Sequence, residues 1–133
     1  MIDPVPPEAL LAAYPEPMRR IGEDLRSLVR GGMPDAIERV RTGWRVIGYD
    51  PSSGRRSAYF CWIMPETVHV HPGFVYGVLM EDPDRLLEGR IRRARWVTFR
   101  PGEPLDPLRL AWLVHEGARV ARVTAGERLA AAL

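Results

Sequence analysis

The chain has 133 residues, of which 46% are hydrophobic and 27% are charged, and its formal net charge is +2. This length and composition predict a single globular domain over residues 1–133, and they exclude a largely disordered chain. The small net charge gives little attraction for nucleic acid, and the absence of lysine excludes Schiff-base chemistry. The only cysteine, Cys61, cannot form an internal disulfide, so we expect a cytoplasmic protein.

The N-terminal part of the chain predicts one main helix. Residues 1–16 are rich in proline and show no secretory signal pattern, and no apolar run in the chain approaches the roughly 20 residues of a membrane span. From Pro17 to about Arg30, apolar residues recur at helical spacing, with a charged ridge that we expect to face solvent. Gly31 ends this helix, and residues 34–39 predict one further helical turn.

The middle of the chain predicts a sheet. Asp82-Pro83 between the strands predicts a short helix, and Asp106-Pro107 predicts the C-terminal helix, with residues 124–133 as a tail. Most connections are too short for a crossover, so the fold class is α+β. We expect an antiparallel sheet of about five strands with the N- and C-terminal helices packed on one face. The predicted strands are Gly43–Tyr49, Ser57–Met64, Thr67–His71, Gly73–Met80 and Arg92–Phe99.

Three motifs at consistent spacing carry a family resemblance. The first is P-D-A-I-E-R-V-R-T-G-W-R-V-I-G-Y at Pro34–Tyr49. The second is V-H-V-H-P-G-F-V-Y-G-V-L-M-E-D-P-D-R-L-L-E-G at Val68–Gly89, and R-W-V follows at Arg95–Val97. Together they resemble the YdhG-like family, a domain of unknown function, over about residues 15–120. The resemblance implies a frataxin-like α–β–α sandwich.

One branch of that family is described as intracellular iron chaperones that deliver iron to partner proteins, which gives an alternative function. The chain departs from the family at Arg90–Arg92, where related chains continue Thr-Gly-Lys, and this weighs against an anion-binding loop there. A frataxin-type iron site would need a carboxylate-rich helix ridge. The N-terminal helix offers only Glu23 and Asp24 among four arginines, which weighs against iron delivery.

Two of the three histidines form the candidate metal site. His69 and His71 lie two apart on a predicted strand, so both side chains leave one face with their Cα atoms roughly 7 Å apart. A third ligand would come from Glu66, Cys61 or His115. Carboxylate-rich sites suit iron, whereas an imidazole pair favours zinc, nickel or copper. The alternative is that the two histidines are polar residues that line a cleft or face solvent.

Arginines and aromatic residues suggest a ligand surface. Strand alternation divides the arginines between Arg90 and Arg100 over two faces, which does not favour nucleic-acid binding, but Arg95 can meet the carboxylate or phosphate of a ligand. The predicted strands carry more large rings than simple core filling requires, so some rings line a ligand cleft or a dimer contact, or else lie in the core and on an ordinary surface.

We find no catalytic constellation, because Cys61 lies among apolar neighbours and no nucleophile has a recognisable base. The sequence therefore predicts a non-enzymatic binding module that needs no cofactor. Its unidentified partner is a small molecule or a protein, not nucleic acid or a membrane, and the protein is a monomer or a homodimer. The alternative is a metal chaperone for iron or zinc at His69 and His71. The expected surface, on the sheet face that the helices leave open, comprises Trp44, Tyr59, Trp62, His69, His71, Phe74 and Arg95.

Overall fold

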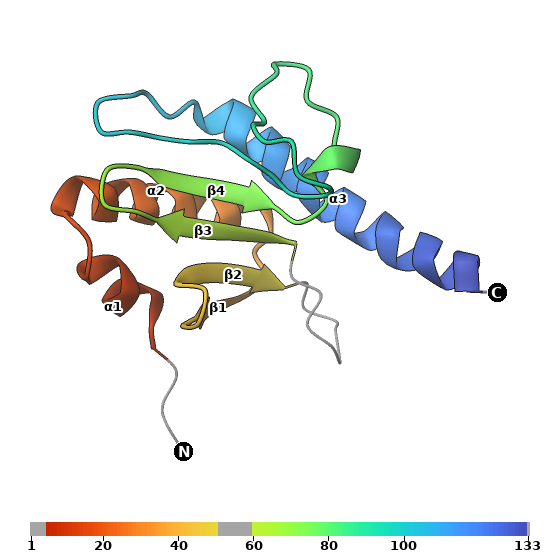
Figure 1. Cartoon of the computed structure of the whole chain (residues 1–133), viewed down its shortest axis with the longest axis horizontal. Coiled ribbons are helices and arrows are strands. Elements are labelled where there is room, and N and C mark those ends of the chain that lie inside the picture. The colour runs from red at the N-terminus through yellow and green to blue at the C-terminus, as the bar shows by residue number, and fades with distance from the viewer. Residues whose placement is uncertain (1–4, 51–59, 133) are drawn as a thin grey trace.

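Five antiparallel strands form one open sheet in which each strand pairs with its neighbours in the chain, in the order β1-β2-β3-β4-β5 (Figure 1). The computed structural model that shows them describes residues 5–50 and 60–132. This arrangement confirms the predicted α+β fold class. The strands are β1 (Ile37–Arg41), β2 (Val46–Asp50), β3 (Cys61–Pro65), β4 (Val70–Phe74) and β5 (Arg95–Trp96).

The two long helices form where the sequence patterns predict them, and the C-terminal one continues through the predicted tail at residues 124–133 as far as Ala132. Short α1 (Pro7–Ala12) precedes α2 (Glu16–Gly32), and α3 (Pro107–Ala132) closes the described chain. At the start of α3, the Asp106 carboxylate accepts hydrogen bonds from the backbone N–H groups of residues 108 and 109. A side chain that satisfies these free donors stabilises the beginning of a helix.

Helices α2 and α3 cover one face of the sheet. Figure 1 shows α2 behind β3 and β4, and Leu25 of α2 and Val114 of α3 border a narrow gap together with Phe74 of β4. A Cβ atom on Gly117 of α3 would lie 2.7 Å from Cδ1 of Phe74, so helix and strand are in close contact. The strand residues of the core cluster that point to this covered face are Val40, Ile47, Tyr49, Cys61, Ile63, Val70 and Phe74.

A buried ion pair connects α2 to the edge strand β1. Arg26 is only 6% exposed, which corrects the expectation that the whole charged ridge of this helix faces solvent. Its guanidinium group contacts Glu38 at 2.7 Å, and the hydroxyl group of Tyr49 donates to the same carboxylate at 2.7 Å. Burial raises the pKa of Glu38, but hydrogen bonds from Arg26 and Tyr49 lower it further, so the pKa lies below its usual value.

Two predicted elements before β4 differ from the structure. Residues 34–39 do not make a helical turn, because Ile37–Arg41 pairs along its whole length with β2. The predicted strand Gly43–Tyr49 starts later, since residues 42–45 form the turn between β1 and β2. Of the predicted strand Ser57–Met64, the part up to Tyr59 lies outside the described residues.

The segment after β3 differs more. Strand β4 begins only at Val70, and the predicted strand Gly73–Met80 is wrong, because β4 ends at Phe74 and a single 3₁₀ turn, η1 (Gly77–Leu79), follows. The predicted helix at Asp82-Pro83 is also wrong. The Asp82 carboxylate accepts from the backbone N–H groups of residues 86 and 87, but the chain makes only a turn. Of the predicted strand Arg92–Phe99, two residues form β5.

Candidate functional site

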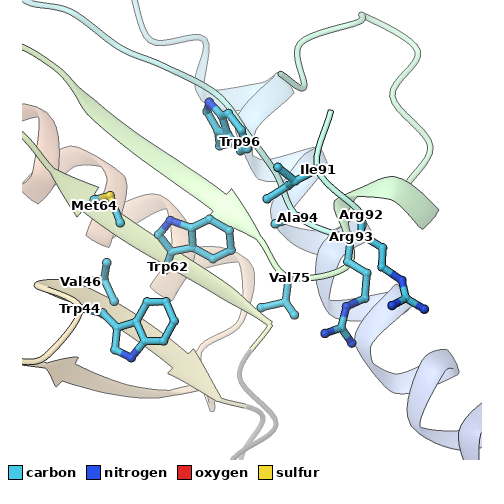
Figure 2. A pocket seen from close by; sticks show the side chains of 10 residues that line it. All are labelled: Trp44, Val46, Trp62, Met64, Val75, Ile91, Arg92, Arg93, Ala94 and Trp96. Atoms are coloured by element: carbon cyan, nitrogen blue, oxygen red, sulfur yellow. The ribbon is translucent and has the colours of Figure 1, made fainter. Parts of the chain in front are cut away.

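The face of the sheet opposite α2 and α3, called the open face here, carries the candidate site. Because side chains alternate along a strand, the residues between the buried ones on β2, β3 and β4 all point to this side. A pocket of about 520 Å³ lies there (Figure 2). Its volume falls within the range of about 300–1,000 Å³ that is usual for small-molecule sites. The residues that line it are Trp44, Val46, Trp62, Met64, Val75, Ile91, Arg92, Arg93, Ala94 and Trp96.

Trp62 lies at the centre of the open face because glycine flanks it on both neighbouring strands. The register pairs Trp62 with Gly48 of β2 and with Gly73 of β4. A Cβ atom on Gly73 would lie 2.1 Å from Cζ2 of Trp62, so the indole ring lies against the bare backbone of β4. The large ring therefore spans the sheet surface instead of standing upright from it.

The indole N–H group of Trp62 is buried and has no hydrogen-bond partner among the described residues. A buried donor without a partner costs about 1–3 kcal/mol, so natural proteins rarely contain one. Packing alone does not explain why the protein accepts this cost. We therefore infer that the open face needs the indole ring of Trp62 in this position.

The second wall of the pocket is the segment that leads into β5. Trp96 exchanges backbone hydrogen bonds with Glu88, and its ring packs where a Cβ atom on Gly89 would lie, only 2.5 Å from Cζ3. Gly89 has a φ of 108°, a conformation that glycine adopts without strain. The Glu88 carboxylate also accepts from the N–H group of residue 98 at 2.7 Å. These contacts fix Trp96 beside the pocket although β5 is very short.

Two arginines give the pocket its only charged side among the lining residues. In Figure 2 the side chains of Arg92 and Arg93 lie on the right and run downward, whereas Met64 and Trp44 lie on the left. The guanidinium carbon of Arg93 lies 5.6 Å from the centre of the Tyr76 ring, a cation–π distance. Within the described part of the chain, Arg92 forms no ion pair. The pocket is thus apolar over most of its lining and positive at one side.

The two candidate metal ligands lie together on the open face. The ring centres of His69 and His71 are 5.2 Å apart, and Nε2 of His71 lies 3.0 Å from the sulfur of Met64. Met64 and His71 are directly opposed in the register of β3 and β4. Burial lowers the pKa of His71, and the neighbouring His69 lowers it further, while Glu66 and Glu88 raise it. The net shift in the pKa of His71 is downward, which favours the neutral form of its imidazole ring.

The third ligands expected from the sequence do not join these histidines. Cys61 is buried on the covered face, where burial raises the pKa of its thiol. His115 belongs to α3, and its Nε2 atom lies 3.9 Å from the Cβ position of Gly32 at the end of α2. Among the side chains of residues 5–50 and 60–123, no three from His, Cys, Asp or Glu are grouped so as to hold a metal ion.

The structure brings together only some of the seven residues predicted for the ligand surface. Trp44, which is 74% exposed in the β1–β2 turn, and Trp62 line the pocket, and His71 lies next to it with its ring 6.5 Å from that of Trp96. The structure corrects the expected position of Phe74. Because Phe74 lies an even number of residues after Val70 on β4, it points to the same face as Val70 and is buried under the helices.

Arg95 is the second correction. Its guanidinium group donates to the backbone carbonyl groups of residues 91 and 94, so it holds its own loop instead of facing the pocket. Tyr59 lies outside the described residues. Because side chains alternate along a strand, the sequence could have placed Met64 and Val75 on the same face as Trp62 and His71. No local pattern indicates that residues 91–94 fold back over the sheet.

Comparisons with family models, with curated proteins and with solved structures gave no match for this chain. The resemblance to the YdhG-like family therefore stays an expectation. No helix in the described part of the chain combines the length and the apolar character needed to cross a membrane.

Proposed function

We propose that this protein is a non-enzymatic binding module whose ligand occupies the pocket on the open face. The observation that carries the proposal is the apolar pocket of about 520 Å³ between Trp62 and the segment 91–96. Binding pockets are typically concave and apolar, with a few polar groups that orient the ligand. The described residues that line the pocket include no histidine, cysteine or carboxylate, and hence no side chain that commonly serves as nucleophile or base near neutral pH.

The composition of the pocket defines the chemical class of the ligand. Trp44, Trp62 and Trp96 offer ring surfaces, which favour a flat, apolar molecule. Arg92 and Arg93 favour an anionic group on the same molecule, because guanidinium groups bind carboxylates and phosphates well. The proposed ligand is therefore a small planar molecule with one negatively charged end.

Two fluorescent probes test the two parts of this proposal separately. Anilinonaphthalene sulfonate has a flat apolar body and an anionic group, whereas N-phenylnaphthylamine has a similar body and no charge. We expect both probes to bind and Trp62→Ala to weaken both by about tenfold, which corresponds to roughly 1.4 kcal/mol. Replacing Arg92 and Arg93 with Gln should weaken only the anionic probe, by about two- to fivefold, because these arginines are exposed.

Arg100→Gln provides the matched control, since Arg100 is exposed and does not line the pocket. If neither probe binds, or if Trp62→Ala leaves both affinities unchanged, the pocket is not a binding site. If the arginine variant weakens both probes equally, the apolar part of the proposal stands and the anionic part is wrong. Circular dichroism of each variant shows that the fold is intact.

Iron delivery has less support in the structure. The carboxylate of Glu23 on α2 binds Arg26 at 2.9 Å, so it is not available for an exposed acidic ridge. The histidine pair on the open face has a different ligand chemistry, which is developed below.

A further inference from the structure

We infer that Met64, His71 and His69 bind one soft, monovalent metal ion, Cu(I). The inference starts from the shared position of these three side chains on the open face. Met64 and His71 are cross-strand neighbours, and their donor atoms Sδ and Nε2 are 3.0 Å apart. His69, at the entrance to β4, places its ring 5.2 Å from the ring of His71.

The distance between the two imidazole rings fits a shared ion. A metal–nitrogen bond of about 2.0–2.1 Å places each ring centre about 3.1 Å from the metal. With a ligand–metal–ligand angle of about 110–120°, two such rings have centres roughly 5.1–5.4 Å apart. The observed separation of His69 and His71 agrees with this value. The sulfur of Met64, on the opposing strand, supplies the third donor.

The type of donor selects the metal. Thioether sulfur is a soft ligand that favours Cu(I), and imidazole binds copper as well as zinc. None of the three donors carries a negative charge, and all three residues are partly buried. A dication held only by neutral donors leaves more uncompensated charge in such a place than a monovalent ion does. The donor set therefore favours Cu(I) over iron or zinc.

The sheet holds two of the donors in place before an ion binds. Both backbones belong to the ladder between β3 and β4, with Ile63 and Val70 beside them buried on the covered face. The ring of Trp96 lies 6.5 Å from that of His71 and adds an aromatic surface next to the ion. A rigid site loses little conformational entropy on binding.

The test is an anaerobic titration of the full chain with Cu(I) in competition with the chromophoric chelator bicinchoninate. We expect one equivalent of Cu(I) to be withdrawn from the chelator. Because changes around metal ligands already cost about 10–100-fold in affinity, Met64→Leu should weaken binding by at least about tenfold. Leu is close to Met in volume, so this variant keeps the fold. Met18→Leu, on the buried side of α2, is the matched control and should have no effect.

Two further variants keep the test decisive. His71→Gln should also weaken binding by at least about tenfold. If His71→Gln fails to fold, Met64→Leu decides alone. Cys61→Ala should leave the affinity unchanged. The inference is overturned if Cu(I) is not withdrawn, if Cys61→Ala removes binding, or if zinc binds as tightly and Met64→Leu changes nothing, since the last result would leave only an imidazole pair.

Discussion

Replacing Gly73 with alanine tests whether the indole ring of Trp62 lies against the backbone of β4 on the open face. The new Cβ atom would lie 2.1 Å from Cζ2 and 2.3 Å from Cε2 of the indole ring. Carbon atoms in good contact are about 3.5–4.0 Å apart, so the ring has to move by roughly 1.4 Å or more. The φ angle of Gly73 is not left-handed, so the alanine adds no backbone strain and the effect is purely steric.

Two opposing terms set the expected loss of stability. Adding a methyl group to a well-packed site costs typically 1–3 kcal/mol, and the lower part of that range applies because Trp62 can lift into the pocket. Alanine also restricts the unfolded chain, which stabilises the protein by about 0.4–1 kcal/mol. We therefore expect Gly73→Ala to lower the free energy of unfolding by about 1 kcal/mol and to weaken binding of both probes.

A double-mutant cycle with Trp62→Ala isolates the clash. In that background the ring is absent, and Gly73→Ala should raise the free energy of unfolding by about 0.4–1 kcal/mol. The measurement is urea denaturation followed by circular dichroism. Gly43→Ala is the control, because no atom lies within 4 Å of its Cβ position. If Gly73→Ala lowers the free energy of unfolding by the same amount with and without the Trp62 ring, the described contact between that ring and Gly73 is wrong.

Two further predictions concern the covered face. Gly117→Ala on α3 should destabilise the protein by about 1 kcal/mol, because overpacking against Phe74 outweighs the gain in helix propensity. Gly31→Ala on α2 should instead stabilise the protein by up to about 1 kcal/mol, because the new methyl group lies in open space. Urea denaturation distinguishes the two, and equal effects would contradict the contact between α3 and β4. The pKa of Glu38 is lower in the folded protein, so its contribution is complete above about pH 4.3 and is lost as the pH falls through the folded pKa. Glu38→Gln should therefore be less stable than the natural protein at pH 7, and the difference should shrink as the pH falls through the folded pKa of Glu38. Exposed Glu16→Gln should change stability by less than about 0.5 kcal/mol over the same pH range.

The sequence predicts the helices better than the strands, and the two Asp-Pro pairs show why. At Asp106 the capping carboxylate is followed by a long apolar periodicity, and α3 forms. At Asp82 the same carboxylate accepts two backbone N–H groups, but Arg85 then takes a φ of 53° and Glu88 pairs with Trp96. A cap satisfies local donors in either case, and contacts distant in the chain decide whether a helix follows.

Strand β1 was missed because its signal is not local. Residues 37–41 read I-E-R-V-R, and three of the five are charged, so no apolar run marks a strand. Its pairing with β2 and the contact between Arg26 and Glu38 determine its structure. The position of Phe74 was misjudged for a related reason. The sequence pattern predicted one strand that ends at His71 and another that begins at Gly73. It therefore did not indicate that Phe74 and Val70 lie on one strand and point to the same face.

The part of the candidate site that depends on the alternation of side chains along a strand was predictable. The part that depends on the loop before β5 folding back over the sheet was not. Trp62 and His71 follow from the side-chain period of a strand, and that same period includes Met64. Arg92 and Arg93 reach the pocket only because the segment before β5 folds over the sheet, held by Arg95 and Glu88. Such a return depends on backbone contacts between distant residues, which alternation does not encode.

The pocket exists because residue sizes on the open face are strongly uneven. A sheet face lined with medium-sized apolar side chains forms a continuous layer that another helix or a second sheet must cover. Here one large ring, Trp62, lies between Gly48 and Gly73, so neither neighbouring strand presents a side chain directly opposite it. The Trp62 ring fills the space that Gly73 leaves, and the loop before β5 closes one side of the pocket beside that ring. Filling that space at Gly73 should therefore affect stability and ligand binding through one and the same movement of the indole ring.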